Sequence, residues 1–168
     1  GVNAGNSIES GGNYNTVVGD EAGTALTTGD GNVAVGFEAL KTEDANGEST
    51  AIGYQALKTQ NAGISGLNVA VGYKAGAAVT TGTINTLIGA LAGDALTTGN
   101  SNVAVGHTAL SADTLGDRNV AIGNNALAQQ NFTSSTDSYN VAIGYVAGGS
   151  VTTGVQNTLI GGLAGDAI

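Results

Sequence analysis

The chain contains no cysteine, proline, methionine or tryptophan, and only two phenylalanines and five tyrosines among its 168 residues. Without cysteine it has no disulfide framework, thiol chemistry or cysteine-based zinc site. Four Lys and Arg stand against 13 Asp and Glu, a formal net charge of −9. This balance argues against nucleic acid as a partner, because sequence-tolerant binding needs a basic patch. No apolar run approaches the roughly 18–20 residues of a membrane span, so we expect no membrane insertion.

The chain is instead rich in glycine, with 29 residues, and in a motif that recurs nine times. Each copy reads Asn (Ser in one copy), Val or Thr, an apolar residue, Val or Ile, Gly, two variable residues and Ala. The copies start at residues 15, 32, 49, 68, 85, 102, 119, 140 and 157, and six of the eight intervals are 17 residues long. A fixed short period of this kind is typical of a solenoid.

We number positions within a copy from its first residue, which is position 0. Positions 1–3 predict a short strand that the glycine at position 4 ends. Seventeen residues are too few for two helices with turns, so the sequence predicts an all-β protein. It would form a β-solenoid of about nine coils over residues 15–168, with coils about 4.8 Å apart. Residues 1–14 would be a cap or an incomplete coil, and the Asn at position 0 suits a stacked amide ladder. The structural glycines at position 4 are Gly19, Gly36, Gly53, Gly72, Gly89, Gly106, Gly123, Gly144 and Gly161.

Position 8 switches between Gly and Leu, and position 11 switches with it. Where position 8 is Gly, position 11 is apolar: Leu26, Val79, Leu96, Val151 and Ile168. Where position 8 is Leu, position 11 is polar: Glu43, Gln60, Asp113 and Gln130. We interpret this as volume compensation in a narrow core, with one large apolar group per coil. The pattern repeats every four copies, and the two long copies, 49–67 and 119–139, share a phase, so their extra residues should bulge from equivalent places.

The strand pattern also predicts self-association. Alternate strand residues face opposite sides, and we expect positions 1 and 3 to face the coil interior and position 2 to face outward. Position 2 is nevertheless apolar in every copy, from Val17 to Leu159. A strand that is apolar on both faces is covered on both faces. The sequence therefore predicts an obligate homo-oligomer in which another copy covers position 2.

The segments Asn-Val-Ala-Val-Gly-Phe-Glu-Ala-Leu (32–40) and Asn-Val-Ala-Ile-Gly-Tyr-Val-Ala-Gly (140–148) resemble the head repeats of YadA-like trimeric autotransporter adhesins. They are also similar to repeats of phage and marine-bacterial tail-fibre-like proteins, and the resemblance covers residues 15–168. It implies a left-handed parallel β-roll, a homotrimer with the strand near the threefold axis, and an extracellular place on a bacterial cell surface or a virion fibre. The 17-residue copy is longer than the compact adhesin coil, and no neck, stalk, anchor or chaperone domain is recognisable, so adhesin and fibre both stay open.

No constellation of catalytic or metal-binding residues emerges, so we expect no enzyme, cofactor or metal. His107, the only histidine, occupies position 5, and no Ser or Asp keeps a fixed register with it. We interpret it as one more flat side chain in a stacked column. The six-residue period of hexapeptide acyltransferases is missing, as are the acidic spacing of a calcium loop and the carboxylate pair of a glycosidase.

Two groups of aromatic residues are the candidate ligand-binding sites. Phe37, Tyr54 and Tyr73 occupy position 5 of three consecutive copies and predict an aromatic ladder. Such a ladder is either structural or a strip that stacks on the sugar rings of a glycan. Phe132 and Tyr139 lie in the insert 129–139, the longest departure from the period. Loops on a rigid scaffold often carry recognition.

These observations favour a structural and adhesive segment of a trimeric extracellular or virion fibre, with a host-surface glycan or protein as receptor. Three alternatives stay open: an ice-binding solenoid, a calcium-binding solenoid and a purely structural filament. The ice-binding alternative depends on the Thr-Thr-Gly segments that Thr27, Thr80, Thr97 and Thr152 begin. These occur in four of nine copies, and an interrupted array makes a poor flat face.

Overall fold

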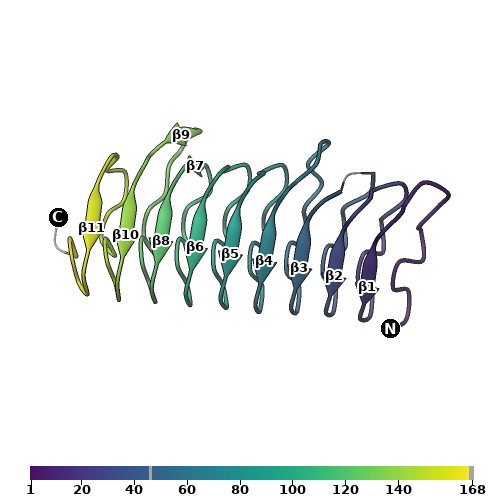
Figure 1. Ribbon diagram of the computed structural model, residues 1–168. Coiled ribbons are helices and arrows are strands. Elements are labelled where there is room, and N and C mark those ends of the chain that lie inside the picture. The colour runs from purple at the N-terminus through teal and green to yellow at the C-terminus, as the bar shows by residue number, and fades with distance from the viewer. Residues whose placement is uncertain (46, 167–168) are drawn as a thin grey trace.

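The computed structural model describes residues 1–45 and 47–166, and within them the chain winds into a rod of stacked coils without helices (Figure 1). One parallel sheet runs along the rod in the order β1-β2-β3-β4-β5-β6-β8-β10-β11, and β7 pairs with β9 in a small second sheet. The strands of the large sheet are β1 (Thr16–Val18), β2 (Val33–Val35), β3 (Thr50–Ile52), β4 (Val69–Val71), β5 (Thr86–Ile88), β6 (Val103–Val105), β8 (Val120–Ile122), β10 (Val141–Ile143) and β11 (Thr158–Ile160). The small sheet joins β7 (Gly116–Asp117) to β9 (Thr136–Asp137).

Each strand of the large sheet pairs with the same three positions of the neighbouring copy. Val69 lies beside Thr86, for example, and Val71 beside Ile88. The register holds across the 19-residue and 21-residue copies as well, since Thr50 pairs with Val69 and Val120 with Val141. One copy is therefore one coil, and the predicted parallel β-solenoid is confirmed.

The glycine at position 4 is required by the close approach of neighbouring coils. Gly89 has a φ of 131°, and a Cβ built on it would lie 2.5 Å from the carbonyl oxygen of Gly106 in the next coil. Gly106 stands in the same relation to Gly123. A side chain on either glycine would collide with backbone, and the positive φ at position 4 of every copy favours glycine as well.

The predicted amide ladder is present at position 0. The backbone N–H of Asn85 donates to Oδ1 of Asn68 at 2.8 Å, and that of Asn102 donates to Oδ1 of Asn85 at 3.0 Å. Nδ2 of Asn85 also donates to the carbonyl of Gly99 at 2.9 Å. These asparagines are fully buried, so the ladder satisfies polar groups that would otherwise be left without partners in the interior.

Our expectation for the two strand faces is wrong: position 2 faces the interior, and positions 1 and 3 face outward. Ala70 and Leu87 at position 2 are fully buried, whereas Ile52 and Ile88 at position 3 are each 39% exposed. The interior is so narrow that alanine fits it best, and the β-branched residues go to the outer face. Because side chains alternate along a strand, an error of one residue in phase reverses both faces.

The predicted exchange of the large apolar group between position 8 and position 11 is confirmed. Leu40 and Leu57 at position 8 are fully buried, as are Leu26 and Leu96 at position 11; Ile168 lies outside the described residues. A Cβ on Gly93 would come within 3.0 Å of Leu96 Cδ1. Glycine at position 8 therefore makes room for the large residue at position 11.

The prediction of one large apolar group per coil misses a second group at position 2. Leu87 lies between two glycines of position 8, and Cβ atoms built on Gly76 and Gly93 would each come within 2.7 Å of a Leu87 methyl group. Leu159 stands in a similar relation to Gly148, at 3.0 Å. Two consecutive glycines thus create space for an extra leucine that the outward-facing interpretation had placed on the surface.

Residues 1–14 stack on the first coil with the hydrogen bonds that join complete coils. The N–H of Gly5 donates to the carbonyl of Ala22, and that of Glu9 to the carbonyl of Thr27. The Ile8 side chain lies over Gly5 as Leu26 lies over Gly23. These contacts continue the stacking of the coils at the N-terminal end of the rod. Figure 1 also shows that the loops of the two long copies rise on the same side of the rod, as their common phase predicts.

Candidate functional sites: an uncharged sheet face and a stacked aromatic column

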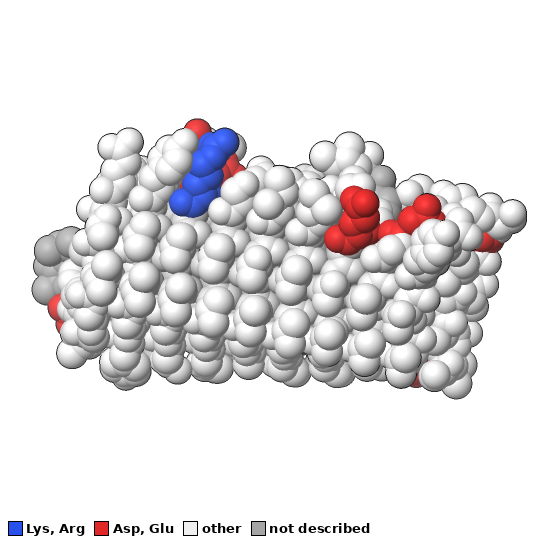
Figure 2. All heavy atoms as spheres, in the orientation of Figure 1, with Lys and Arg blue, Asp and Glu red and all other residues white. Residues whose placement is uncertain are grey.

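One surface feature runs along the whole rod, namely the outer face of the nine-stranded sheet, which we call the sheet face. It consists of the outward side chains at positions 1 and 3 of the strands β1–β6, β8, β10 and β11. Position 1 is Thr or Val and position 3 is Val or Ile in all of them. Figure 2 shows this side of the rod as an uncharged surface, with acidic and basic residues confined to its margins.

The sheet face is regular because the copies are in register. Strands about 4.8 Å apart give nine rows over roughly 40 Å, and two outward residues per strand give a width near 10 Å. Apolar patches of more than a few hundred Å² on soluble proteins generally mark an interaction site. Its side chains present methyl groups and a few threonine hydroxyls. This face can therefore bind a partner through shape complementarity and burial of apolar area, and it offers no charged group for recognition.

The predicted aromatic ladder forms at the corner beside the sheet face. The rings of Phe37 and Tyr54 stack with centroids 5.2 Å apart, and those of Tyr54 and Tyr73 stack 5.4 Å apart. The Lys74 ammonium lies 5.4 Å from the Tyr73 ring centroid. Neighbouring rings thus occupy both faces of Tyr54, which leaves ring edges and the outer ring faces for a ligand.

His107 occupies the same corner, two coils beyond Tyr73, and is exposed. Its Nδ1 lies 3.3 Å from the hydroxyl of Thr108, which itself donates to the His107 carbonyl at 2.7 Å. Among the described residues no carboxylate makes a hydrogen bond with the imidazole. The side-chain group that the His107 imidazole contacts is therefore the Thr108 hydroxyl.

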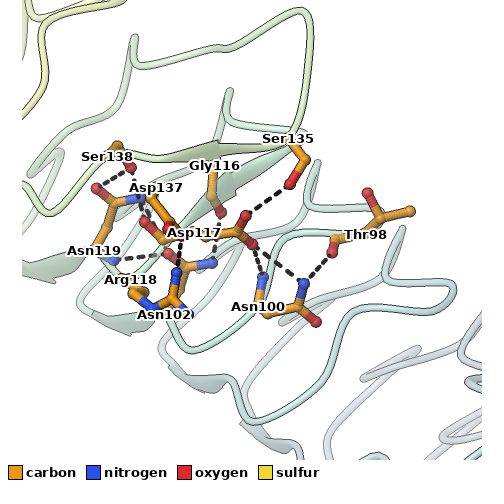
Figure 3. Close-up of polar contacts among 10 residues, drawn as sticks. All are labelled: Thr98, Asn100, Asn102, Gly116, Asp117, Arg118, Asn119, Ser135, Asp137 and Ser138. Carbon is orange, nitrogen blue, oxygen red and sulfur yellow. Dashed lines mark hydrogen bonds and ion pairs between the residues drawn. The ribbon is translucent and has the colours of Figure 1, made fainter.

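The two candidate residues of the insert 129–139 lie in different environments. Phe132 is only 6% exposed, so it anchors the insert. Tyr139 is 48% exposed, and the Arg118 guanidinium lies 5.6 Å from its ring centroid. Arg118 also forms an ion pair with Asp137 of β9 (Figure 3). Of the two aromatics, Tyr139 is the one that a ligand can reach.

Asp117 of β7 fixes the insert to the preceding coils. Its Oδ1 accepts hydrogen bonds from the Asn100 backbone N–H at 2.6 Å and from Asn100 Nδ2 at 3.2 Å. Its Oδ2 accepts the Ser135 hydroxyl at 2.8 Å. Figure 3 shows these contacts beside the ladder residues Asn102 and Asn119. The insert is thus a structured projection from the rod.

A second set of polar groups, which the sequence analysis treated only as part of a pattern, lies inside the rod. Nε2 of Gln130 donates to Asp113 Oδ2 at 2.6 Å, and Oε1 of Gln130 accepts Nδ2 of Asn140 at 2.7 Å. Burial raises the pKa of the Asp113 carboxyl, against the hydrogen bonds from Gln130 and from the backbone of Gly116, which lower it. Asp113 and Gln130 at position 11 and Asn140 at position 0 therefore form a buried hydrogen-bonded chain across three coils.

The same chain of contacts recurs four coils earlier in the sequence. Nε2 of Gln60 donates to Glu43 Oε2 at 2.8 Å, and Nδ2 of Asn68 donates to Oε1 of Gln60 at 2.8 Å. Gln60 and Gln130 each stand directly before one of the two long loops. The two chains of contacts thus support the bases of both projections.

One cluster of four charged side chains lies near the aromatic ladder. Glu38 forms ion pairs with Lys41 and Lys58, each at 2.7 Å, and these lysines lower its pKa to about 2. Lys41 also pairs with Glu21, and both partners raise the pKa of its ammonium. The charged groups here neutralise one another.

Within residues 1–45 and 47–166, no group of three or more His, Asp or Glu side chains is placed to hold a metal ion. The same residues include no helix that could cross a membrane. No protein-family model, curated protein or solved structure matches this chain.

Proposed function

We propose that the chain is a non-enzymatic structural segment of an extracellular or virion fibre, in which the sheet faces of several copies pack against one another and the rod supports attachment to a host or surface. The resemblance to adhesin and tail-fibre repeats suggests three copies and left-handed coils. The observation that carries the proposal is the uncharged sheet face along the whole rod.

The charge distribution supports a contact between copies over a contact with a charged partner. The chain carries a net charge of −9, yet none of these charges lies on the nine strands of the sheet face. Copies that meet through this face keep their acidic residues at the margins and in solvent. A charged partner would find no complementary group on it. An exposed apolar face of this length also risks uncontrolled aggregation, which a closed assembly prevents.

The experiment is a matched pair of lysine substitutions. Ile88→Lys places a charge at the middle of the sheet face, and His107→Lys places the same charge on the exposed corner. We expect Ile88→Lys to lower the self-association constant at least 100-fold, since a buried interface does not tolerate an unpaired charge. His107→Lys should leave it within two-fold. Equal association of both variants and the parent chain would overturn the proposal.

The sheet face also favours one second candidate, ice binding. A flat array of Val, Ile and Thr side chains at a regular spacing is a better candidate for this than the Thr-Thr-Gly segments, where the hydroxyls of Thr80 and Thr97 bond to the next coil. A monomer that shows thermal hysteresis, lost in Ile88→Lys, would support this candidate.

A further inference from the structure

One asparagine of the insert 129–139 differs from every other asparagine in the chain. Of 17 asparagines, only Asn131 is followed two residues later by Ser or Thr, in the segment Asn131-Phe132-Thr133. Asn-x-Ser/Thr with x other than Pro is the acceptor pattern for N-linked glycosylation of exported proteins. The pattern alone is weak, so its structural setting decides whether it can function.

The setting of Asn131 leaves its reactive atom free. The residue is exposed, its backbone N–H donates to the Thr152 carbonyl at 2.9 Å, and its Oδ1 accepts the Thr114 hydroxyl at 3.0 Å. Within the described part of the chain no hydrogen bond engages its Nδ2. The backbone and the amide oxygen are thus held, and the amide nitrogen, which accepts the sugar, is free in solvent.

The two residues that follow Asn131 complete the acceptor pattern and lie in different environments. Phe132 is buried and anchors the segment, whereas Thr133 is exposed like Asn131. A glycosylating enzyme must contact Asn131 and Thr133, and both lie on the surface. In Figure 1 the loop that carries β9 rises beyond the ends of the strands and does not cross the sheet face. Asn131 itself contacts Thr114 and Thr152, which lie outside the strands, so a glycan on it would leave the sheet face free.

The other long loop contains a natural comparison. Asn61 follows Gln60 as Asn131 follows Gln130, is exposed, and donates its N–H to the Thr80 carbonyl at 2.8 Å. Its loop has Gly63 where the insert has Thr133. The two loops therefore share the base and the asparagine, and they differ in the residue that completes the acceptor pattern.

We propose that Asn131 is an acceptor for N-linked glycosylation. The donor class is an oligosaccharide joined through a diphosphate to a lipid carrier. The Asn131 Nδ2 attacks C1 of the first sugar, the C1–O bond to phosphate breaks, the amide loses one proton, and the lipid diphosphate leaves. The step requires no oxidant or reductant.

The test is secretion of the chain through a eukaryotic secretory pathway, followed by intact-mass and peptide mass spectrometry. We expect one N-glycan on Asn131, none on Asn61, retention in Thr133→Ser and complete loss in Thr133→Ala. Thr133 is exposed, so neither variant should disturb folding. Secreted, folded protein with unmodified Asn131 would overturn the proposal, as would modification that persists in Thr133→Ala.

The same samples separate this proposal from the proposed function. The glycosylated chain and the Thr133→Ala chain should have the same number of copies per particle. Assembly that fails only in the glycosylated chain would contradict the placement of Asn131 away from the sheet face. Assembly that fails in both would contradict the sheet-face contact and leave the glycan result unaffected.

Discussion

The coils with Gly at position 8 and those with Leu at position 8 solve one packing problem in two ways. We call them Gly-type coils (starting at residues 15, 68, 85, 140 and 157) and Leu-type coils (starting at 32, 49, 102 and 119). In both, position 8 has a left-handed backbone: φ is 59° at Gly76 and 47° at Leu57. Leucine in this conformation is strained by about 1–2 kcal/mol, which burial of its side chain, worth about 1.5–3 kcal/mol, offsets.

The difference shows that the interior of this rod conserves volume rather than polarity. When leucine occupies position 8, the space at position 11 holds a polar residue such as Gln60 or Gln130, fully buried and hydrogen-bonded. When glycine occupies position 8, position 11 becomes apolar and, in the coil starting at 85, Leu87 fills the remaining space. The backbone conformation stays the same, and only the position that supplies the buried side-chain atoms changes.

The largest expected effect comes from a hybrid of the two coil types. Gly93→Leu would bring a Cβ within 2.7 Å of Leu87 and 3.0 Å of Leu96. We expect the free energy of unfolding, measured by urea titration, to fall by about 3 kcal/mol through overpacking. The double variant Gly93→Leu, Leu87→Ala should recover part of this loss, because it removes the atoms that collide. Strictly additive effects of the two changes would contradict volume compensation.

The next effect concerns the buried polar chain of the Leu-type coils. Gln130→Leu removes the amide that donates to Asp113 and leaves that carboxylate with backbone donors only. We expect a loss of about 2 kcal/mol in the free energy of unfolding, as for other buried groups deprived of a partner. Gln156→Leu makes the same change at an exposed site and should cost less than about 0.5 kcal/mol. Equal losses would show that Gln130 does not support the interior.

A smaller effect is expected at the corner outside the core. Tyr54→Ala removes two stacking contacts and should lower the free energy of unfolding by about 1 kcal/mol. Tyr145→Ala, at the same position of another coil and 61% exposed, should lower it by less than about 0.5 kcal/mol. If both variants melt alike, the ladder is not structural. A glycan array with Tyr54→Ala and Tyr73→Ala then tests whether the ladder also binds sugars.

The smallest effect is a pH dependence from single carboxyl groups of the two coil types. Burial raises the pKa of Asp113 in a Leu-type coil and of Asp94 in a Gly-type coil, so their charged forms destabilise the folded rod near neutral pH. The melting temperature should therefore rise as the pH falls from 7 through the folded-state pKa values toward the ordinary aspartate pKa of 3.8. Glu38, whose pKa is lowered to about 2, acts in the opposite direction, and stability should fall between about pH 4.5 and 2.

Asp113→Asn tests how much the Asp113 carboxyl contributes to the rise in melting temperature as the pH falls. Its melting temperature should rise less than that of the parent chain as the pH falls from 7 toward 3.8. An identical profile would mean that the Asp113 carboxyl carries no part of the pH dependence.

Much of the fold could be predicted from the sequence because the repeat constrains it many times over. The 17-residue period predicted the coils, the glycine at position 4 predicted the turns, and the asparagine at position 0 predicted the amide ladder. None of these predictions depends on which strand face is inside. Polarity could not show which strand face lies inside the coil, because positions 1, 2 and 3 are all apolar or β-branched. The decisive signal was size: alanine at position 2 fits a narrow interior, and the leucines there coincide with paired glycines at position 8.

The candidate sites were only partly predictable for a related reason. Residues in register, such as Phe37, Tyr54 and Tyr73, could be placed because the period sets their spacing. Phe132 and Tyr139 lie in an insert outside the period, and their burial depends on contacts that no repeat encodes. The buried hydrogen bonds that link Asp113, Gln130 and Asn140 could not be predicted, because these residues come from three different coils. The sequence showed only that position 11 is polar in the Leu-type coils.

Sedimentation equilibrium of the full chain is the most direct test of the sheet face as a contact between copies. We predict particles of three times the 16.2 kDa chain mass, reduced to single chains by Ile88→Lys and unchanged by His107→Lys. A parent chain that sediments as a stable folded monomer at micromolar concentration would contradict this contact.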